Sequence, residues 1–390
     1  MTDIYSWLGD DNLPLMDVNT EHPDVISQLQ TWIPEYVKEF GIDGIRIDAA
    51  KHVRGDFWPG FCGASGVFCI GEVYTDDMNF AADWQKEGWM DSILGFPLYY
   101  SITAAFGTPM GNMSHFIDIS GQVLQNFPVS SAIGCRGLTD NQHPEYIGNF
   151  IENHDLPRFR NATVDPQLAY NAMIVQFVFE GIPVVYYGQE QDTSFGASDP
   201  YNRNALWQSN YTNTTTYQRM ATMNEVRSSI IANNTEFNGE TFMSARSKVI
   251  ASSQYDVAIR KGPVLAVLTN RGSPVMNATF GVTDSGWPSA SVVVDVLSCR
   301  QMPVGSDDTI TISYAQPGYG GMPYVFLSLA DAQSIGICGL SKGVKAEVNP
   351  TATRNTDSKD KKNSATSLTS PLCSVAALIC TVALALSVLT

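Results

Sequence analysis

Three stretches of the chain have apolar residues at helical spacing. In residues 24–40 the apolar positions are Val25, Ile26, Leu29, Trp32, Ile33, Tyr36, Val37 and Phe40. This spacing places them on one face and predicts an amphipathic helix. Residues 168–180 and 217–232 have a similar helical pattern. These segments are therefore predicted to be helices that cover a buried layer.

Short apolar runs alternate with the helical stretches between residues 42 and 188. They are "GIDGIRID" from Gly41, "GVFCIGEV" (66–73), "MDSILGF" (90–96), "EYIGNFIEN" (145–153) and "IPVVYYG" (182–188). Strands that alternate with helices favour a parallel sheet with crossover helices. The sequence therefore predicts an α/β domain with five visible strands.

The pattern changes after about residue 235, where short β-rich runs are broken by Gly, Pro and Ser. This texture is typical of a small all-β domain. We therefore divide the chain into an α/β part (1–235), a β domain (236–340), a Ser/Thr-rich linker (341–370) and an apolar tail (371–390).

The apolar tail allows two interpretations. A polar spacer, small residues at Asn363, Ser364 and Ala365, and an apolar run to the last residue are typical of a GPI-attachment signal. A tail-anchor helix is the alternative. The GPI interpretation predicts a secreted protein that is held at the cell surface or cell wall and reaches the membrane through its anchor.

Charge and sequons support this location and exclude one class of partner. The formal net charge is −16, and such an acidic surface repels phosphate backbones, so we expect no nucleic-acid partner. The N-glycosylation sequons begin at Asn112, Asn161, Asn210, Asn213, Asn233 and Asn277. They predict a glycoprotein with glycans on surface loops.

A carboxylate with a basic neighbour ends the first predicted strand. In "GIRID", Arg46 and Asp48 share a face because side chains alternate along a strand. A guanidinium beside a carboxylate keeps it ionised, and an ionised Asp can act as a nucleophile. A purely structural Arg–Asp pair remains the alternative.

Two further acids end later strands. Glu72 follows an apolar run with no basic neighbour in sequence, and apolar surroundings would raise its pKa and suit a general acid. Asp155 follows "FIENH" with His154 beside it. Each acid alone could cap a loop, but three at the carboxyl ends of parallel strands predict an active site. Paired carboxyl groups are the requirement of glycoside hydrolysis.

At this point the motifs resemble a known family. "GIRIDAAKH", "GEV", "FIENHD", "GIPVVYYGQEQ" and "DPYNRNALW" are similar, in order, to the signature regions of fungal α-amylases. The resemblance runs from about residue 5 to residue 340. It implies a (β/α)8 TIM barrel followed by a C-terminal β-sandwich domain. It also implies that the substrate is an α-1,4-glucan or maltooligosaccharide.

The resemblance implies a role for each matching residue. Asp48 would be the nucleophile, Glu72 the general acid/base, and Asp155 the group that holds substrate hydroxyls and favours the distorted transition state. The implied substrate-binding residues are Arg46, Lys51, His52, His154, Asp199 and Arg203. Glu152 and Asn153 would tie the strand end together.

The chain also departs from the family. The first barrel strands and the inserted domain have no counterpart, so we expect an N-terminally truncated member with an incomplete barrel. Leu15 stands where the family has a calcium-binding Asp, and a Leu side chain offers no oxygen ligand. Calcium is therefore doubtful, with only the backbone carbonyl of His52 left as a family ligand.

The cysteines match the family in part. Cys299 and Cys338 correspond to a family disulfide. Cys135 corresponds to a half-cystine whose partner is missing, and Cys62 is the candidate replacement. We interpret Cys69 as a buried free thiol. Cys373 and Cys380 lie in the apolar tail.

Three functions remain open at this point. The first is a retaining hydrolase that cleaves internal α-1,4 bonds of starch-like glucans. The second is a 4-α-glucanotransferase that acts on cell-wall α-glucan through the same triad, because water or a sugar hydroxyl can resolve the glycosyl-enzyme intermediate. The third is a non-catalytic amylase-like binding protein.

Overall fold

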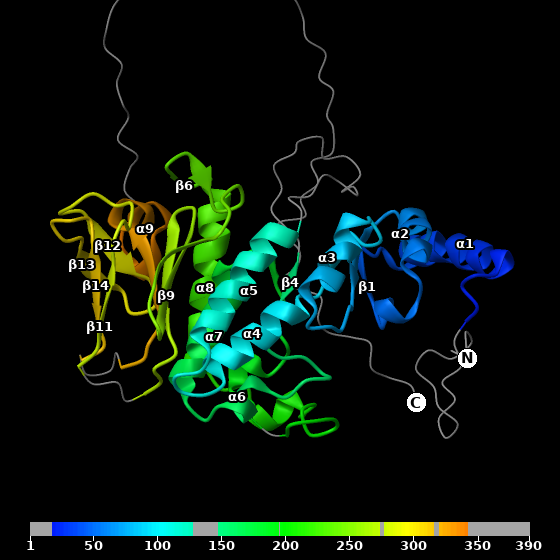
Figure 1. Cartoon of the computed structure of the whole chain (residues 1–390), viewed down its shortest axis with the longest axis horizontal. Coiled ribbons are helices and arrows are strands. Elements are labelled where there is room, and N and C mark those ends of the chain that lie inside the picture. Colours follow the sequence, from blue (N-terminus) through cyan, green and yellow to red (C-terminus); the bar gives the residue numbers. More distant parts are fainter. Residues whose placement is uncertain (1–17, 128–146, 195, 274–276, 316–319, 342–390) are drawn as a thin grey trace, which may run out of the picture.

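The computed structural model describes residues 18–127, 147–194, 196–273, 277–315 and 320–341. A row of short parallel strands forms the sheet of the first part of the chain (Figure 1). Its strands are β1 (Gly44–Ile47), β2 (Phe68–Gly71), β3 (Ser92–Ile93), β4 (Gly148–Asn149) and β5 (Ile182–Pro183). The pairs β1–β2, β2–β3 and β4–β5 are parallel, and a parallel bridge between Leu94 and Gly148 joins β3 to β4. The predicted parallel sheet is therefore confirmed.

The ladder is shorter than the apolar runs that predicted it. In the described part of this run, residues 147–153, only β4 is assigned as a strand, although Phe150, Ile151 and Glu152 beyond it are buried. An apolar run indicates that its side chains are buried. A strand requires in addition a neighbouring strand that accepts and donates its backbone hydrogen bonds. Most of the run therefore follows the sheet edge as connecting chain.

Helices precede, connect and follow the parallel strands, as the alternating pattern predicted. They are α1 (Pro23–Phe40), α2 (Trp58–Ser65), α3 (Met78–Lys86), α4 (Phe96–Phe106), α5 (Met113–Asn126), α6 (Phe159–Ala162), α7 (Pro166–Val178) and α8 (Thr215–Ala232). Several begin with a side-chain cap: Asp77 accepts from the backbone of Asn79 and Phe80 at the start of α3, and Thr214 accepts from Tyr217 at the start of α8. The predicted helices at 24–40, 168–180 and 217–232 are confirmed as α1, α7 and α8.

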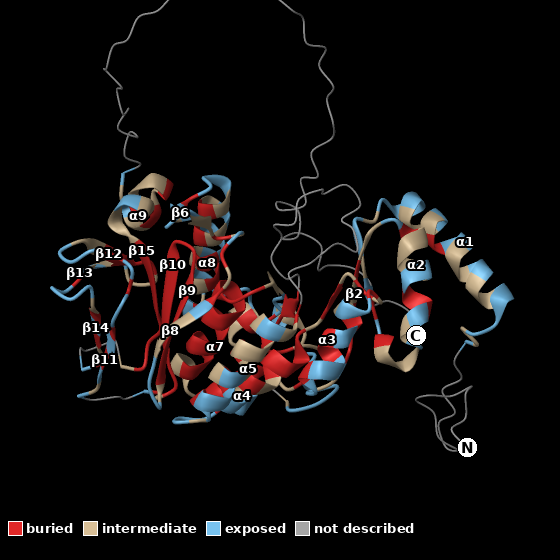
Figure 2. Ribbon diagram, turned by 45° about the horizontal axis from the view of Figure 1, so that its top comes forward, coloured by how far each residue is buried: buried red, intermediate tan, exposed pale blue. Residues whose placement is uncertain are grey.

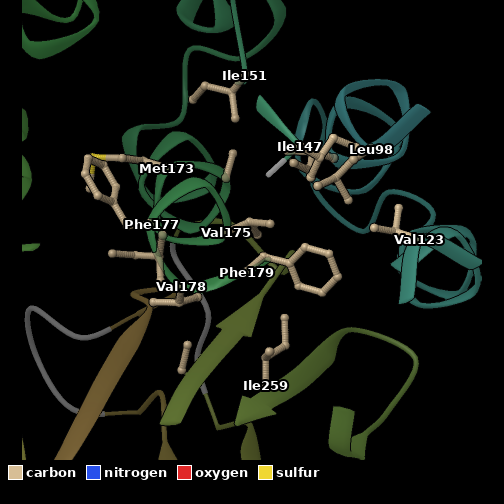
Figure 3. Close-up of a cluster of buried hydrophobic side chains, with 14 of the residues drawn as sticks. Leu98, Val123, Ile147, Ile151, Met173, Val175, Phe177, Val178, Phe179 and Ile259 are labelled. Carbon is tan, nitrogen blue, oxygen red and sulfur yellow. The ribbon is translucent and has the colours of Figure 1, made fainter. Parts of the chain in front are cut away.

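Helix α7 lies at the centre of the core. Every residue from Leu168 to Val178 is buried, so the helix is covered on all sides rather than on one face (Figure 2). It packs against α4, α8 and β10 (Val264–Thr269). Phe177, Val178 and Ile259 belong to one apolar cluster, which joins α7 to the C-terminal strands (Figure 3). The two parts of the chain therefore share a core.

The C-terminal part is built from antiparallel strands. Six of them form a sheet in the order β13-β12-β15-β10-β9-β8. Their bounds are β8 (Lys248–Ser252), β9 (Asp256–Lys261), β10, β12 (Val292–Asp295), β13 (Arg300–Pro303) and β15 (Tyr324–Ser328). The pairs β11 (Thr279–Val282) with β14 (Ile310–Ser313) and β6 (Glu236–Phe237) with β7 (Glu240–Thr241) are also antiparallel, and α9 (Leu329–Ile335) follows β15. The predicted all-β domain is confirmed.

A buried ion pair crosses the boundary between the two parts. The carboxylate of Glu180, just after α7, lies 2.7 Å from Nζ of Lys261 at the end of β9, and both side chains are almost fully buried. The carboxylate also accepts from the backbone N–H of Ser247. Nζ of Lys261 donates to the carbonyl of Ala245 at 2.8 Å. Several hydrogen bonds therefore satisfy the two buried charges.

The disulfides correct one cysteine assignment. Cys299 and Cys338 are bonded, as the resemblance implied. Cys69 is bonded to Cys62, so the prediction of a free thiol at Cys69 was wrong, and Cys62 is not left for Cys135. Sequence could not show this pair because α2 turns back at Gly66 and brings Cys62 beside β2.

Several predictions fall outside the described residues. Leu15, Cys135, the linker from Lys342 onward, and the tail with Cys373 and Cys380 all lie there. The asparagines of the six sequons are all described and exposed, and glycosylation remains a prediction. Within the described ranges, no helix has the length and apolar character to cross a membrane.

The buried ion pair at the boundary gives a stability test. Lys261→Met should lower the free energy of unfolding by about 3–5 kcal/mol, because it leaves the Glu180 carboxylate buried without its cation. Lys248→Met is the matched control, since Lys248 pairs with Glu240 at 3.6 Å on the surface and should cost less than about 1 kcal/mol. Denaturant unfolding measures both, and equal losses would contradict the assignment.

Candidate active site

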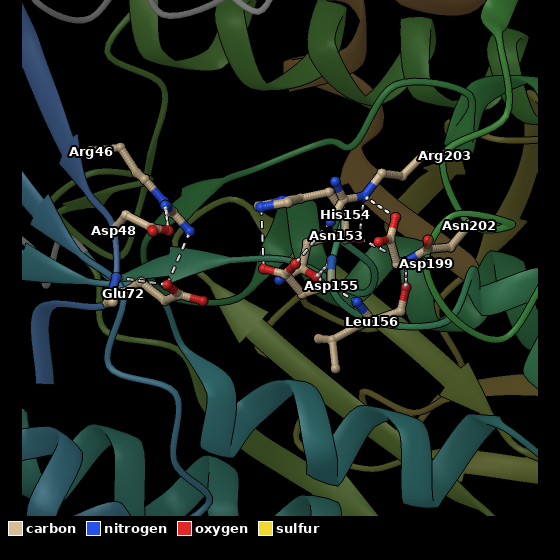
Figure 4. Close-up of polar contacts among 11 residues, drawn as sticks. Arg46, Asp48, Glu72, Asn153, His154, Asp155, Leu156, Asp199, Asn202 and Arg203 are labelled. Carbon is tan, nitrogen blue, oxygen red and sulfur yellow. Dashed lines mark hydrogen bonds and ion pairs between the residues drawn. The ribbon is translucent and has the colours of Figure 1, made fainter. Parts of the chain in front are cut away.

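Strand β1 places Arg46 and Asp48 on the same side of the chain, as the alternation predicted. Ile47 is buried on the opposite side, whereas Arg46 and Asp48 are exposed. Nη1 of Arg46 donates to Oδ1 of Asp48, and the pair stands at the carboxyl end of β1. Figure 4 shows this pair with Glu72 at one side of the site.

The pKa of Asp48 lies below its ordinary value. Partial burial raises this pKa, but the hydrogen bond and charge of Arg46 more than offset the effect of burial. A hydrogen bond with Glu72 and the charge of His154 lower it further. Asp48 is therefore an ionised carboxylate at neutral pH, in the state that a nucleophile needs.

Glu72 follows β2 and is buried beside the same guanidinium. Its Oε2 lies 3.3 Å from Nη2 of Arg46 and accepts from the backbone N–H of Ala49 at 3.0 Å. Glu72 has no basic neighbour in the sequence, so we expected only apolar side chains around it. That expectation was wrong, because Arg46 lies beside it. Pairing of β1 with β2 supplies the missing cation from the adjacent strand.

An open hollow lies beside Glu72. It measures about 200 Å³ and is lined by Ala49, Lys51, His52, Glu72 and Tyr74. Nζ of Lys51 donates to the carbonyl of Tyr74 and lies 5.6 Å from the centre of its ring. Burial lowers the pKa of His52, and the charge of Lys51 lowers it further, while Glu72 opposes this. The hollow thus combines two acid–base groups, a cation and an aromatic ring.

The segment after β4 carries the third acid. Oδ1 of Asn153 accepts from the backbone N–H groups of Asp155 and Leu156, both at 2.9 Å, so it fixes the turn in which Asp155 stands. Oδ2 of Asp155 lies 3.1 Å from Nε2 of His154, and Oδ1 lies 3.3 Å from Nη2 of Arg203. Asp155 therefore lies between His154 and Arg203, and its side chain is partly exposed.

Arg203 joins this group to the loop that contains Asp199. Its Nε lies 2.9 Å from Oδ1 of Asp199 and donates to the carbonyl of His154 at 3.1 Å. Asp199 and Arg203 are both exposed. Figure 4 shows His154 and Asp155 facing the Arg46–Asp48–Glu72 group from the other side. The structure therefore brings together the residues that the resemblance placed at the site.

Three supporting residues were not found from the sequence. Arg158 and Asn202 are fully buried beneath His154 and Asp155, and Tyr74 forms a wall of the hollow. Sequence gave only a weak signal, a lone Arg and a lone Asn within otherwise ordinary loops. The contacts of Arg158 with Asn202 and Tyr187, and of Asn202 with His154, join residues 29–48 positions apart, which local patterns do not report.

Two family models together match almost all of the chain that is described. The model of the α-amylase catalytic domain matches residues 5–245, and the model of α-amylase domain C matches residues 249–346. The chain belongs to the α-amylase family. The predicted fold, a TIM-barrel catalytic domain followed by a C-terminal antiparallel domain, is confirmed.

Fungal relatives agree with this assignment. Alpha-amylase 2 of Schwanniomyces occidentalis is 35% identical over 339 residues, which cover 85% of this chain and 61% of the relative. An alpha-amylase of Saccharomycopsis fibuligera is 34% identical over 330 residues, which cover 84% and 61%. The chain thus spans about three fifths of these relatives.

A solved structure is similar as well. The alpha-amylase from Malbranchea cinnamomea superposes with a TM-score of 0.73 at 34% identity, over 83% of this chain and 64% of that one. The likeness extends from the parallel sheet into the antiparallel domain, because it covers most of the described residues.

The calcium ion that the resemblance implies is not assigned to any residue of this chain. Within the described ranges, no group of three or more His, Cys, Asp and Glu side chains is arranged to hold a metal ion. Leu15 lies outside those ranges, and its side chain has no oxygen ligand. No step of the chemistry below is assigned to a metal.

The hollow beside Glu72 gives a pH test. Lys51→Met should raise the pKa of His52, because it removes a nearby positive charge that opposes protonation, while burial still holds that pKa below its ordinary value. Histidine NMR titration measures this, and a His52→Gln variant assigns the signal among the five histidines. The control Lys86→Met, at an exposed pair with Asp83, should leave the His52 pKa unchanged. An identical His52 titration in the parent, Lys51→Met and Lys86→Met would refute the effect of Lys51 on His52.

Proposed function

We propose that this protein is a retaining endo-hydrolase of α-1,4-glucans. The observation that carries the proposal is the sharing of Arg46 by two carboxyl groups, one exposed and ionised and one buried beside an open hollow. Paired carboxyl groups of this kind suit attack and protonation at one glycosidic bond. Membership of the α-amylase family supports the choice of α-glucan as substrate.

In the first step, the Asp48 carboxylate would attack the anomeric carbon of the sugar. Glu72 would give its proton to the glycosidic oxygen, so that the bond to the leaving sugar breaks as the glycosyl–Asp48 bond forms. In the second step, water would lose a proton to Glu72, and its oxygen would bond to the same carbon and release Asp48. The net reaction adds one water across one glycosidic bond.

Asp155 and His154 would bind the sugar that is being cleaved. A carboxyl group and an imidazole 3.1 Å apart can accept from and donate to neighbouring sugar hydroxyls. Such contacts speed the reaction when they strengthen as the ring distorts toward the oxocarbenium-like transition state. Asp199 and Arg203 would bind the chain on the glycone side, and Lys51 and His52 on the leaving side.

The first test is Asp48→Asn with maltoheptaose as substrate. Loss of the nucleophile should lower kcat by about 10⁴-fold or more, because the covalent step has no other carboxylate in place. Product formation by mass spectrometry measures the change. Asp118→Asn is the control, since Asp118 is exposed on α5 and contacts Gln122.

Two results would count against hydrolysis by this site. Equal rates for Asp48→Asn and Asp118→Asn would reject Asp48 as the nucleophile. Binding of maltoheptaose by the parent chain with no products would instead favour the non-catalytic binding protein.

A second candidate is a 4-α-glucanotransferase, which one observation favours. The hollow beside Glu72 has an aromatic wall, Tyr74, whose ring lies 4.5 Å from that of Phe96 and is thereby supported. An aromatic face can hold an incoming sugar against the intermediate and compete with water for it. Transfer would then use the same two carboxyl groups, with a sugar hydroxyl in place of water.

Tyr74→Ala separates the two candidates. If Tyr74 holds an acceptor sugar, the parent should form oligomers longer than maltoheptaose, and the variant should lower their ratio to shorter products several-fold. Tyr217→Ala is the control, because Tyr217 is exposed on α8 and does not line the hollow. Only shorter oligomers from the parent would reject transfer.

A further inference from the structure

Arg158 is a buried cation beneath the segment that carries His154 and Asp155. Its side chain has no exposed surface, and Nη1 lies 2.9 Å from Oε1 of Glu152, which is buried as well. The other oxygen of Glu152 accepts from the backbone N–H of Phe159 at 2.7 Å. The Glu152–Arg158 pair therefore closes the loop between residues 152 and 159 from below.

The same guanidinium reaches two other segments of the site. Nε donates to the carbonyl of Asn202 at 2.9 Å, and Nη1 donates to the carbonyl of Tyr187 at 2.6 Å. The guanidinium carbon lies 4.1 Å from the centre of the Tyr186 ring. Arg158 thus contacts three segments: the loop after β4, residues 186–187 after β5, and the loop that contains Asp199 and Arg203.

Asn202 carries these contacts to the candidate catalytic residues. Its Nδ2 donates to the carbonyls of His154 at 2.8 Å and Leu156 at 3.0 Å, on either side of Asp155. The next residue, Arg203, bonds the His154 carbonyl and the Asp155 carboxylate. Arg158 therefore reaches Asp155 through two routes, its own loop and Asn202.

We propose that Arg158 is the positioning residue that sets the orientation of Asp155 and Arg203 toward the substrate. This inference rests on the proposed function. Arg158 has no exposed surface and cannot itself contact a glucan. Its planar fork presents donors from two nitrogens, Nε and Nη1, to three segments, whereas a Lys has all its donors on one nitrogen. Misplacement of a binding group by about 1 Å can cost on the order of 10²-fold in rate.

The test compares Arg158→Lys with the same change at a buried Arg remote from the site. Arg260 is the match, because it is buried against Trp287 in the C-terminal domain, where burial lowers its pKa to about 9. With maltoheptaose well below the melting temperature, Arg158→Lys should lower kcat/KM by about 10–100-fold. Arg260→Lys should change kcat/KM less than threefold while losing a similar amount of thermal stability.

A double-mutant cycle separates positioning from general loss of structure. If Arg158 acts through Arg203, then Arg158→Lys should cost far less in kcat/KM when Arg203 is already Ala. Asn202→Ser provides a second variant that removes the Nδ2 donors and leaves Arg158 in place, and it should lower kcat/KM at least tenfold. If Arg158→Lys does not fold, the activity of Asn202→Ser is measured in its place.

Three outcomes would overturn the inference. They are a folded Arg158→Lys with kcat/KM within threefold of the parent, an equal loss of kcat/KM in Arg260→Lys, and additive effects in the double-mutant cycle.

A binding experiment separates this inference from the proposed function. In a Glu72→Gln background, Arg158→Lys should weaken maltoheptaose binding at least fivefold, as measured by calorimetry. An inactive parent that binds maltoheptaose rejects hydrolysis alone, whereas unchanged binding rejects the role of Arg158.

Discussion

The carboxyl ends of parallel strands lie at one edge of their sheet, and the candidate active site depends on this constraint. Asp48 follows β1, Glu72 follows β2, and the segment with Asp155 follows β4. Residues more than 100 positions apart in the chain therefore meet without any long-range motif in the sequence. The ladders are short, and helices pack against them: α3 contacts β3 and α7 contacts β5. Packing thus sets the geometry, and the strand ends present the charges.

Arg46 distributes one positive charge between two carboxyl groups of unlike surroundings. Asp48 is largely exposed and shares its hydrogen bond with Nη1, whereas Glu72 is buried and meets Nη2 at 3.3 Å. The two carboxyl groups on this one cation therefore differ in exposure and in their contact with the guanidinium. The pKa of Asp48 is held down against the effect of burial. The different surroundings of the two groups suit the proposed roles, in which Asp48 attacks and Glu72 donates a proton.

The sequence could predict those parts of the structure that local patterns encode. Helical spacing predicted α1, α7 and α8, apolar runs located the parallel strands, and polar residues at strand ends located Asp48, Glu72 and Asp155. It could not predict the contact of Arg46 with Glu72, because that contact exists only after β1 pairs with β2. The Cys62–Cys69 bond was missed for the same reason, since the turn at Gly66 decides it. Arg158 and Asn202 were missed because their partners lie on other loops and their burial follows from tertiary packing.

The antiparallel domain is tied to β4, the strand that leads into the segment with Asp155. The side chain of Asn149, in β4, donates to the carbonyl of Glu180, and the carboxylate of Glu180 pairs with Lys261 of β9. Asn171 of α7 accepts from the backbone of Thr269 in β10 and donates to the carbonyl of Gly321. Because β4 leads directly into the segment with Glu152 and Asp155, a shift of the antiparallel domain would move one wall of the site. The buried polar contacts at the boundary are costly to break. The C-terminal domain, packed against α7, therefore supports β4 from behind.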